Sequence, residues 1–495
     1  MRVHFNPALL EVNMIACLED MKRAYGEQTT WSSIPDEYWK LLAGKGYSLL
    51  WLMGIWERSP GSRMCALSEQ GLLREYDHAL PGWNKADVAG SPYAVHAYRP
   101  DSAFGTEKDL AALKKTLNNA GIGLILDFVP NHLALDHPWT LSSPNLFVRA
   151  AKEEHRKNPH MFLTTQNGDI LAHGKDPYFP PWRDTVQINY FMPEVRKAMI
   201  DILLEIARHA DGVRCDMAML VLNRVFEKTW GHFLEERARP EREFWSEAIE
   251  KVKERHPDFL FIAEAYWDLE WRLQGLGFDY TYDKKLYDLL LNAPARLIHE
   301  HLWAEATYQK KSVRFIENHD EPRAAAAFGK ERSMAAAVIA ATVPGMHFFH
   351  DGQHEGLSRR LPVQLKKKMQ EDCDPELPVF YGRLMDYINH ELVYTGTWEL
   401  MDPEPAWDGN PTYHNVLSWI WHDNKRFKMI VVNYSYEDSQ ARVRLPQNLI
   451  QKETMLFHDR LTDHSYARKR SDLLRYGLYV DLHPWQAHLF EIENS

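Results

Sequence analysis

Four short segments, each an apolar run that ends in charged or imidazole side chains, most constrain the fold of this chain. They are residues 127–132 (DFVPNH), 212–216 (GVRCD), 262–264 (IAE) and 317–320 (ENHD). A strand buried on both faces reads as a continuous apolar run, so these segments are typical of strands in a parallel sheet. Helical patterns alternate with them, and this order predicts an α/β fold, a (β/α)₈ TIM barrel. The loops at the carboxyl face of such a barrel would bring the polar residues together.

The remaining patterns extend this prediction to the whole chain. Apolar runs predict eight barrel strands, at 9–12, 47–53, 124–129, 212–217, 259–263, 278–282, 313–316 and 346–349. Helices are predicted at 36–42, 107–120 and 193–208, and residues 58–98 are expected to be rich in loops. Residues 133–184 lack a clear alternation and contain many Pro, His and Trp residues, which indicates an excursion after the third strand. Short strands near the C-terminus predict an antiparallel β-sandwich of about 100 residues.

We therefore expect three structural units. Residues 1–132 and 185–393 would form the barrel, 133–184 a small subdomain over its mouth, and 394–495 the β-sandwich. A chain of 495 residues is too long for one hydrophobic core, which agrees with this division.

Composition and charge exclude several classes of partner. The formal net charge is −11, so neither nucleic acid nor an anionic membrane surface is expected to bind. The chain has four cysteines in no metal-like pattern, no apolar segment of a secretory signal and no run of about 18 apolar residues. A cytoplasmic location, outside any membrane, is the expectation. The oligomeric state is left open.

The four segments, in this order, resemble those of the α-amylase family of glycoside hydrolases, which also includes α-glucosidases, sucrose phosphorylases and glucan-transferring enzymes. The resemblance covers nearly the whole chain. Three further stretches are similar to family motifs: residues 90–106 before the third strand, 184–189 at the end of the excursion, and 344–352 around the eighth strand. The family acts on α-glucosidic bonds with retention of configuration, so the resemblance implies a glycosidase.

Residue by residue, the resemblance implies three catalytic carboxyl groups. Asp216 would be the nucleophile, Glu264 the general acid/base, and Asp320 would bind the hydroxyls of the reacting sugar and hold it distorted. Retaining cleavage needs two carboxyl groups about 5–5.5 Å apart, one ionised and one protonated. The chemistry that the resemblance implies is therefore consistent with these residue types.

Four more side chains would contact the same sugar or its nucleophile. Arg214 would orient and ionise Asp216, since residues two apart on a strand face the same side and a guanidinium lowers a carboxyl pKa. His132 and His319 would hydrogen-bond the sugar, and Tyr93 would stack beneath its ring.

Several polar residues have a structural reading beside a functional one. Asp127 is a candidate general base, but its position within a strand favours an anchor between strands. Asn131 resembles the calcium-binding asparagine of the family; because no cluster of acidic ligands accompanies it, no cofactor is expected and calcium stays a weaker alternative. Residues 350–355 (HDGQHE) have metal-like spacing, yet a polar loop lining the sugar site is the preferred interpretation. Cys215 is expected to be buried and inert.

Trp51, Trp56, Trp139, Trp182 and Trp267 lie near predicted strand ends or in the excursion, and each is a candidate for contact with the sugar.

One departure from the family pattern bears on the substrate. Met219 and Leu220 stand where starch-cleaving members usually carry polar or basic residues that hold the leaving glucan. We therefore expect a hydrolase of short α-glucosides or oligosaccharides, with a small carbohydrate as its partner.

Two alternatives to hydrolysis stay open. The first is a glucosyl-transferring enzyme of the sucrose-phosphorylase or transglycosidase kind, in which residues 366–368 (KKK) and 359–360 (RR) could receive a phosphate. The second, more remote, is a non-catalytic carbohydrate-binding or scaffold protein.

Overall fold

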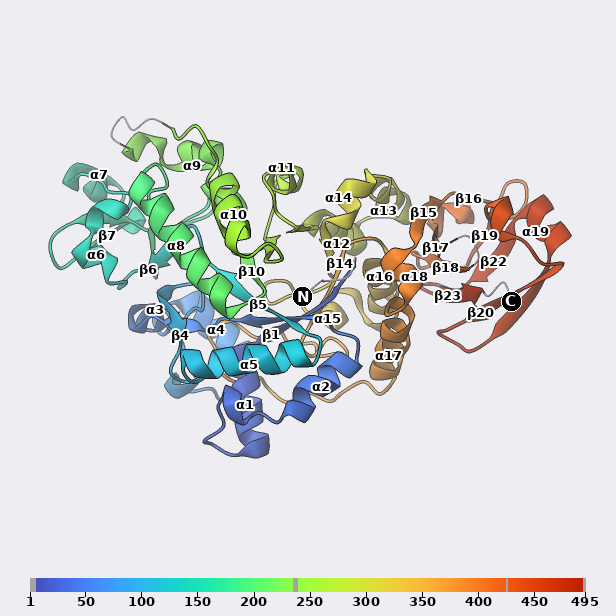
Figure 1. Ribbon diagram of the computed structural model, residues 1–495, viewed down its shortest axis with the longest axis horizontal. Helices are drawn as coiled ribbons and strands as arrows, with labels where there is room; N and C mark the ends of the chain where they lie inside the picture. Colours follow the sequence, from blue (N-terminus) through green and yellow to red (C-terminus); the bar gives the residue numbers. More distant parts are fainter. Residues whose placement is uncertain (1–5, 235–238, 424–425, 493–495) are drawn as a thin grey trace.

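A closed barrel of eight parallel strands forms the centre of the molecule (Figure 1). The structure is a computed structural model that describes residues 6–234, 239–423 and 426–492. Around the barrel the strands follow the order β1-β14-β13-β12-β11-β10-β5-β2. Their bounds are β1 Ala8–Asn13, β2 Leu49–Met53, β5 Gly123–Phe128, β10 Gly212–Cys215, β11 Leu260–Ala263, β12 Tyr280–Tyr282, β13 Ser312–Arg314 and β14 Met346–His350. Each overlaps or abuts one of the eight predicted runs, so the predicted TIM barrel is confirmed.

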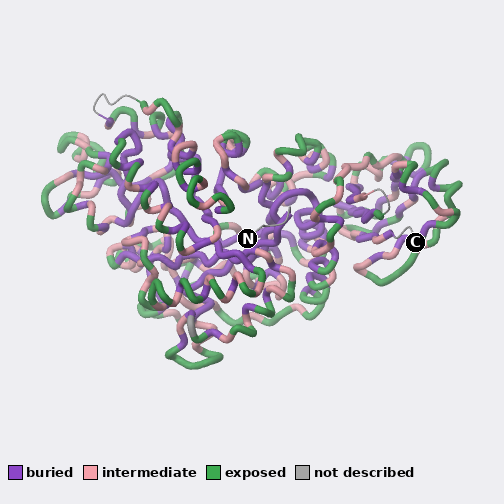
Figure 2. Tube along the Cα trace, viewed as in Figure 1, coloured by how far each residue is buried: buried purple, intermediate pink, exposed green. Residues whose placement is uncertain are grey.

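The barrel strands are apolar because both of their faces are covered. One face lies inside the barrel and the other lies under the surrounding helices, and the strand residues are almost all buried (Figure 2). The ring includes α1 Met14–Tyr25, α2 Asp36–Gly44, α5 Glu107–Asn119, α8 Pro193–His209, α10 Phe244–Arg255, α12 Lys284–Asn292, α16 Lys330–Thr342 and α17 Glu376–Ile388.

Helix α5 illustrates how local sequence determines these elements. Thr106 and Asp109 form a capping box at its N-terminus, and Leu110, Leu113 and Leu117 are its buried stripe. The predicted helix at 107–120 is therefore observed nearly residue for residue.

Shorter helices complete the connections. They are α9 Asn223–Trp230, α11 Glu270–Gly275, α13 Ala295–Leu302, α14 Ala306–Lys310, α15 Ala324–Phe328 and α18 Glu391–Thr395. Among the helices of the described residues, none combines the length and apolar character that a membrane span requires.

The prediction that residues 58–98 are rich in loops is wrong in part. This stretch contains α3 Pro60–Ala66 and α4 Gln70–Ala79, between the paired strands β3 Trp56–Arg58 and β4 Val95–Pro100. The Ser59 hydroxyl caps α3, and Pro60 occupies its first turn. Both helices pack on a small apolar cluster of their own, away from the main core, and few of their residues are buried. Such short helices leave only a weak periodic signal in the sequence.

The excursion after the third barrel strand is a small subdomain with regular structure. It contains two antiparallel pairs, β6 His132–Ala134 with β9 Thr185–Gln187 and β7 Phe162–Thr164 with β8 Ile170–Ala172. Two short helices, α6 Trp139–Ser142 and α7 Lys152–Lys157, complete it. The β6–β9 pair closes the excursion at its base. In Figure 1 these elements gather at one end of the molecule, opposite the C-terminal sheets.

The C-terminal part consists of two antiparallel sheets, as predicted. One has the order β15-β17-β18-β23-β20-β21 and the other β16-β19-β22. The two sheets share an apolar core, to which β17, β18 and β23 contribute from one side and β19 and β22 from the other. The bounds are β15 Thr397–Met401, β16 Pro403–Pro405, β17 Val416–His422, β18 Phe427–Asn433, β19 Ser439–Val443, β20 Thr454–Asp459, β21 Ser465–Lys469, α19 Arg470–Tyr476, β22 Leu478–Leu482 and β23 Ala487–Ile492.

The larger C-terminal sheet is joined to the barrel helices by buried hydrogen bonds. The Trp421 indole donates to the carbonyl of Thr342 at 2.7 Å, and the Tyr434 hydroxyl donates to that of Leu290 at 2.5 Å. Satisfied buried polar groups of this kind hold two packed units in one orientation.

Candidate active site

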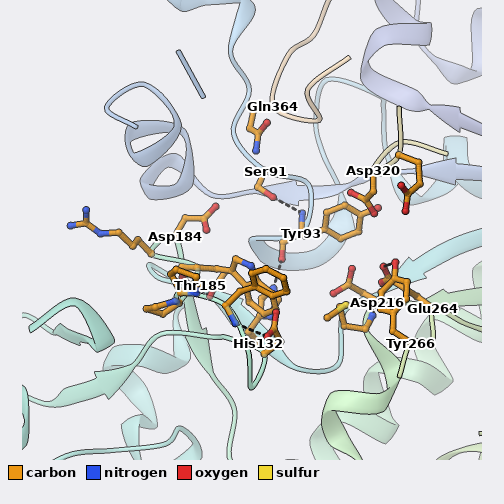
Figure 3. Close-up of a pocket in the computed structure, with 18 of the residues that line it drawn as sticks. Ser91, Tyr93, His132, Asp184, Thr185, Asp216, Glu264, Tyr266, Asp320 and Gln364 are labelled. Atoms are coloured by element: carbon orange, nitrogen blue, oxygen red, sulfur yellow. Dashed lines mark hydrogen bonds between the residues drawn. The ribbon is translucent and has the colours of Figure 1, made fainter. Parts of the chain in front are cut away.

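A cavity of about 1410 Å³ opens at the carboxyl ends of the barrel strands. Loops after β5, β10, β11, β12 and β13 contribute to its wall, together with the excursion and the segment before β4. Figure 3 shows Asp216, Glu264 and Asp320 grouped on one side of it, with Tyr93 close by. Of the seven site residues named from the sequence, five line the cavity directly: Tyr93, His132, Asp216, Glu264 and Asp320.

Arg214 and His319 lie immediately behind this wall and contact the residues that line it. Arg214 is fully buried, and its guanidinium lies 5.0 Å from the centre of the Trp51 ring and 5.3 Å from that of Tyr93. The aromatic faces hold the guanidinium plane in place by cation–π contact.

Arg214 binds the two catalytic carboxyl candidates at once. Its Nη1 donates to Asp216 Oδ1 at 2.8 Å, and its Nη2 lies 2.8 Å from Glu264 Oε2. Both nitrogens belong to one guanidinium group, so the two carboxyl groups are held close together, one by a hydrogen bond and the other by an ion pair. This spacing fits a pair of carboxyl groups that act together on one bond.

Glu264 accepts further hydrogen bonds that fix its orientation. Its Oε2 accepts from the backbone N–H of Met217 at 2.7 Å, and its Oε1 accepts from the Tyr266 hydroxyl at 2.7 Å. Met217 has a φ of 41°, a left-handed conformation that costs about 1–2 kcal/mol for a residue with a side chain. Backbone strain of this kind persists where the surroundings compensate for it and is common at functional sites.

The two carboxyl groups share the charge of Arg214 and act on each other's pKa. Burial raises the pKa of Asp216 and outweighs the opposing effect of Arg214. Burial also raises the pKa of Glu264, against Arg214, and the charges of Asp216 and Asp320 add to the increase. A raised pKa of this kind favours retention of a proton on one of the two carboxyl groups.

Asp320 is held ionised by the neighbouring imidazole. His319 Nε2 lies 3.1 Å from Asp320 Oδ2 and 2.9 Å from the Tyr93 hydroxyl. Although burial in the cavity wall raises the pKa of Asp320, His319 more than offsets it and lowers the pKa to about 2. The rings of Tyr93 and His319 stack with centres 5.4 Å apart, which fixes the Tyr93 ring at the cavity wall.

His132 is neutral. Burial lowers its pKa to about 4, and its Nε2 lies 3.2 Å from the carbonyl oxygen of Tyr93. Its Nδ1 lies 3.3 Å from the Asn131 side-chain amide, so both ring nitrogens have protein partners and the ring lines the cavity as an uncharged group.

Asp127 has the contacts of an anchor. Its carboxyl group accepts from the backbone N–H of Gly54 at 2.8 Å and from the Trp51 indole at 3.2 Å, and its carbonyl accepts from Trp56 at 2.7 Å. Burial raises its pKa to about 7. These bonds tie β5 to β2 and the turn after it.

Cys215 is buried, as predicted, and burial raises its pKa well above the usual thiol value.

Of the five tryptophans proposed as sugar contacts, Trp182 and Trp267 line the cavity. Trp51 and Trp56 are instead buried donors to Asp127, and Trp139 lies outside the lining. Trp267 meets Tyr178 edge to face at 5.0 Å, so the excursion contacts the loop that follows Glu264.

The expectation that residues 350–355 line the sugar site is wrong. All six are described, and none of them lines this cavity. The His350 ring contacts Arg323 at 2.8 Å, and the His354 ring stacks on Tyr381 at 4.3 Å. The His354 ring therefore holds this loop against α17, whereas His350, on β14, contacts Arg323 and lies 3.4 Å from Glu317.

The basic run at 366–368 is already paired with acidic residues. Lys367 lies 2.9 Å from Asp87, and Lys368 lies 3.0 Å from Asp20 and 2.9 Å from Asp351.

Met219 and Leu220 are both buried, and neither lines the cavity.

A calcium site at Asn131 does not fit the residues that surround it. Its side-chain oxygen accepts a hydrogen bond from Gln187 at 3.0 Å, and Gln187 also donates to its carbonyl at 2.8 Å. Within the described ranges, no group of three His, Cys, Asp or Glu side chains gathers as a metal site would require.

Sequence reasoning missed three groups that contact the proposed catalytic residues. They are the Tyr266 hydroxyl, the backbone N–H of Met217 and the Glu11 carboxylate, which binds His319 Nδ1 at 2.5 Å. A signal for Glu11 exists, because it is the single charged residue in the apolar strand 8–13. Nothing in the sequence indicates the backbone donor.

A closed (β/α)₈ barrel with three carboxyl groups, two imidazoles and one arginine at its carboxyl end defines a barrel enzyme of the glycosidase class. Comparison with known proteins identifies the family. The profile described as "Alpha amylase, catalytic domain" matches residues 91–452. The chain belongs to the α-amylase family.

Individual relatives are distant. The chain is 24% identical over 281 residues to "Alpha-amylase 3" of Dictyoglomus thermophilum, covering 52% of each chain. It is 20% identical over 309 residues to "Probable oligo-1,6-glucosidase 2" of Bacillus subtilis, covering 52% of this chain and 54% of that protein. The matches thus span about half of these relatives. The structure resembles that of the "noncanonic maltogenic alpha-amylase AmyB" of Thermotoga neapolitana, with a TM-score of 0.68, 19% identity and 99% of both chains covered.

Proposed function

We propose that this protein is a retaining glycoside hydrolase that cleaves α-glucosidic bonds of short α-glucosides or oligosaccharides through a covalent glucosyl-enzyme intermediate. The observation that carries this proposal is the single guanidinium of Arg214, which binds Asp216 and Glu264 at 2.8 Å each. It supports the close pair of carboxyl groups that a retaining mechanism requires, as opposed to the wider pair of an inverting one.

The first step forms the intermediate. In the reactive state the pair holds one proton, on Glu264. The ionised Asp216 attacks the anomeric carbon, the bond to the glycosidic oxygen breaks, and Glu264 gives its proton to that oxygen. Arg214 disperses the negative charge of Asp216 and orients the carboxylate.

The second step releases the product. Water attacks the anomeric carbon of the ester, Glu264 takes the proton of the water, and Asp216 leaves as a carboxylate. Asp320 accepts hydrogen bonds from the hydroxyls of the sugar in both steps, and Tyr93 supplies a flat face beneath its ring.

The size of the cavity supports an oligosaccharide as the substrate. Its volume of about 1410 Å³ exceeds the 300–1,000 Å³ typical of small-molecule pockets. Trp182 and Trp267 supply aromatic faces on its wall, beyond the sugar that reacts.

Transfer to phosphate, the alternative of a glucosyl transferase, has less support. Lys367 and Lys368 are bound to carboxylates, and Arg360 lies 2.8 Å from Glu75. A phosphate would have to displace these ion pairs. Transfer to a second sugar uses the same catalytic groups as hydrolysis and is an outcome that the test below distinguishes.

The test is to incubate the pure protein with maltose, maltotriose, sucrose, trehalose and soluble starch, each with and without phosphate. Chromatography then identifies the products. Free glucose or maltose without phosphate is the expected result. Glucose 1-phosphate, or oligosaccharides longer than the substrate, would replace hydrolysis by transfer, and no product from any substrate would overturn the proposal.

A further inference from the structure

The Glu11 carboxylate is buried beneath the sugar site, and the mechanism above assigns it no role. It lies on β1, beside His350 of β14 and Trp51 of β2 in the barrel, and its side chain is inaccessible to solvent. A buried ionised carboxylate costs several kcal/mol unless it is paired and hydrogen-bonded. The structure must therefore supply a cationic partner.

That partner is His319. Glu11 Oε1 lies 2.5 Å from His319 Nδ1, and Glu11 Oε2 accepts from the backbone N–H of His319 at 3.2 Å. One carboxylate thus fixes both the ring and the backbone of the residue that precedes Asp320. Trp51 packs against the imidazole edge on, with centres 5.6 Å apart, so the ring cannot rotate freely.

The opposite side of the same imidazole reaches the sugar site. Since Nδ1–H is directed at Glu11, the other nitrogen, Nε2, is left to face Asp320 at 3.1 Å and the Tyr93 hydroxyl at 2.9 Å. A doubly protonated His319 donates from both nitrogens, so it links the buried carboxylate to the exposed one.

We propose, on the basis of the proposed function, that Glu11 is a positioning residue that acts through His319 to keep Asp320 ionised and directed toward the sugar. Asp320, in this arrangement, accepts hydrogen bonds from sugar hydroxyls as a carboxylate that the neighbouring His319 cation stabilises. The charge of that cation depends on Glu11.

The charged and titratable groups around His319 favour its protonated form. Burial lowers the pKa of His319, but Asp320 and Glu11 together raise it well above its usual value. Burial raises the pKa of Glu11, and His319 and His350 more than reverse the effect. The groups that face the pair from the surrounding elements are Tyr93 before β4, Asp127 on β5, Arg214 and Asp216 at β10, and His350 on β14.

Glu11→Gln removes the charge with little change of shape and is the decisive variant. Without Glu11, burial is opposed by fewer charges, chiefly that of Asp320, so His319 should lose its proton at a lower pH than in the wild type. We expect kcat/KM on maltotriose to fall about 10- to 100-fold at about pH 8 and to recover in part at about pH 5. A purely structural role would lower activity equally at both pH values.

Two further variants serve as controls. Glu11→Asp keeps the charge and should restore part of the activity at the higher pH. Glu317→Gln removes another buried glutamate, which binds Arg323 at 3.1 Å and caps the N–H of Ala324 at 2.6 Å. This variant should lower the melting temperature while the titration of His319 stays as in the wild type.

The titration of His319 tests the proposal without any substrate. Histidine-labelled protein is followed by NMR, and the His319 signal is assigned by its loss in His319→Gln. The imidazole of the wild type should stay protonated well above the pH at which a free imidazole titrates, and that of Glu11→Gln should titrate lower. Identical titrations in the two proteins, or a neutral His319 in the wild type at pH 7, would overturn the proposal.

The two proposals can fail separately. If no α-glucoside is cleaved, the function fails while the NMR result still decides the Glu11–His319 pair. If Glu11→Gln does not fold, the wild-type titration and the Glu11→Asp variant still test the proposed role of Glu11.

Discussion

Replacing Arg214 with lysine tests the core of the site, because only a guanidinium can reach both carboxyl groups. Arg214 Nη1 donates to Asp216 Oδ1, and its Nη2 forms an ion pair with Glu264 Oε2, at 2.8 Å each. The single ammonium of lysine cannot make both contacts, and loss of the charge-assisted hydrogen bond to Asp216 sets the expected effect. Such a bond contributes about 1.5–3 kcal/mol. At 1.36 kcal/mol per factor of ten, kcat/KM should fall about 10- to 150-fold.

The assay is the initial rate of maltotriose cleavage at several concentrations, with the melting temperature measured in parallel. Arg314→Lys is the matched control, since Arg314 is equally buried on β13 but binds Asp283, which does not line the cavity, unlike the Asp216 and Glu264 partners of Arg214. It should destabilise the protein and leave kcat/KM of the folded fraction near that of the wild type. The reasoning is refuted if Arg214→Lys keeps more than about half of the wild-type kcat/KM, or if Arg314→Lys loses as much activity.

Three other predictions follow from contacts in and around the site. Asp216→Asn should reduce turnover by orders of magnitude and keep the fold, because the amide oxygen still accepts from Arg214; circular dichroism and activity together decide this, and a mostly active variant would contradict the mechanism. Asp127→Asn should change the pH dependence of stability: the pKa of Asp127 is about 7 in the folded protein and about 3.9 when unfolded, so its ionisation lowers wild-type stability as the pH rises from about 4 to 7, by roughly 4 kcal/mol at most. The variant should lack this decline in urea unfolding, and parallel curves would contradict the raised pKa. Chelation with EDTA should leave the melting temperature unchanged, since Asn131 is bound to Gln187; a large drop would restore the calcium site.

The local sequence indicates which segments are buried strands, whereas contacts between distant segments depend on the tertiary structure. Strand positions and the residues at strand ends were predictable, because a strand that is buried on both faces has a continuous apolar sequence. Thus 127–132, 212–216, 262–264 and 317–320 mark β5, β10, β11 and the loop after β13. The motif spacing likewise indicated Asp216, Glu264 and Asp320, all of which line one cavity. Short helices such as α3 and α4 were missed because they bury few residues.

Contacts between distant segments were decided only by the tertiary structure. Glu11 and His319 are 308 residues apart, and no local pattern indicates that barrel closure places β1 beside β14 and brings the two side chains to 2.5 Å. The same holds for the loop at 350–355, whose polar composition suggested the sugar site although it folds against α17. The hydrophobic periodicity of a sequence indicates whether a residue is buried. Which residue it contacts depends on how the closed barrel brings the strands together. The sequence by itself determined the barrel and indicated the candidate site residues, and the tertiary structure determined which charged side chains lie behind them.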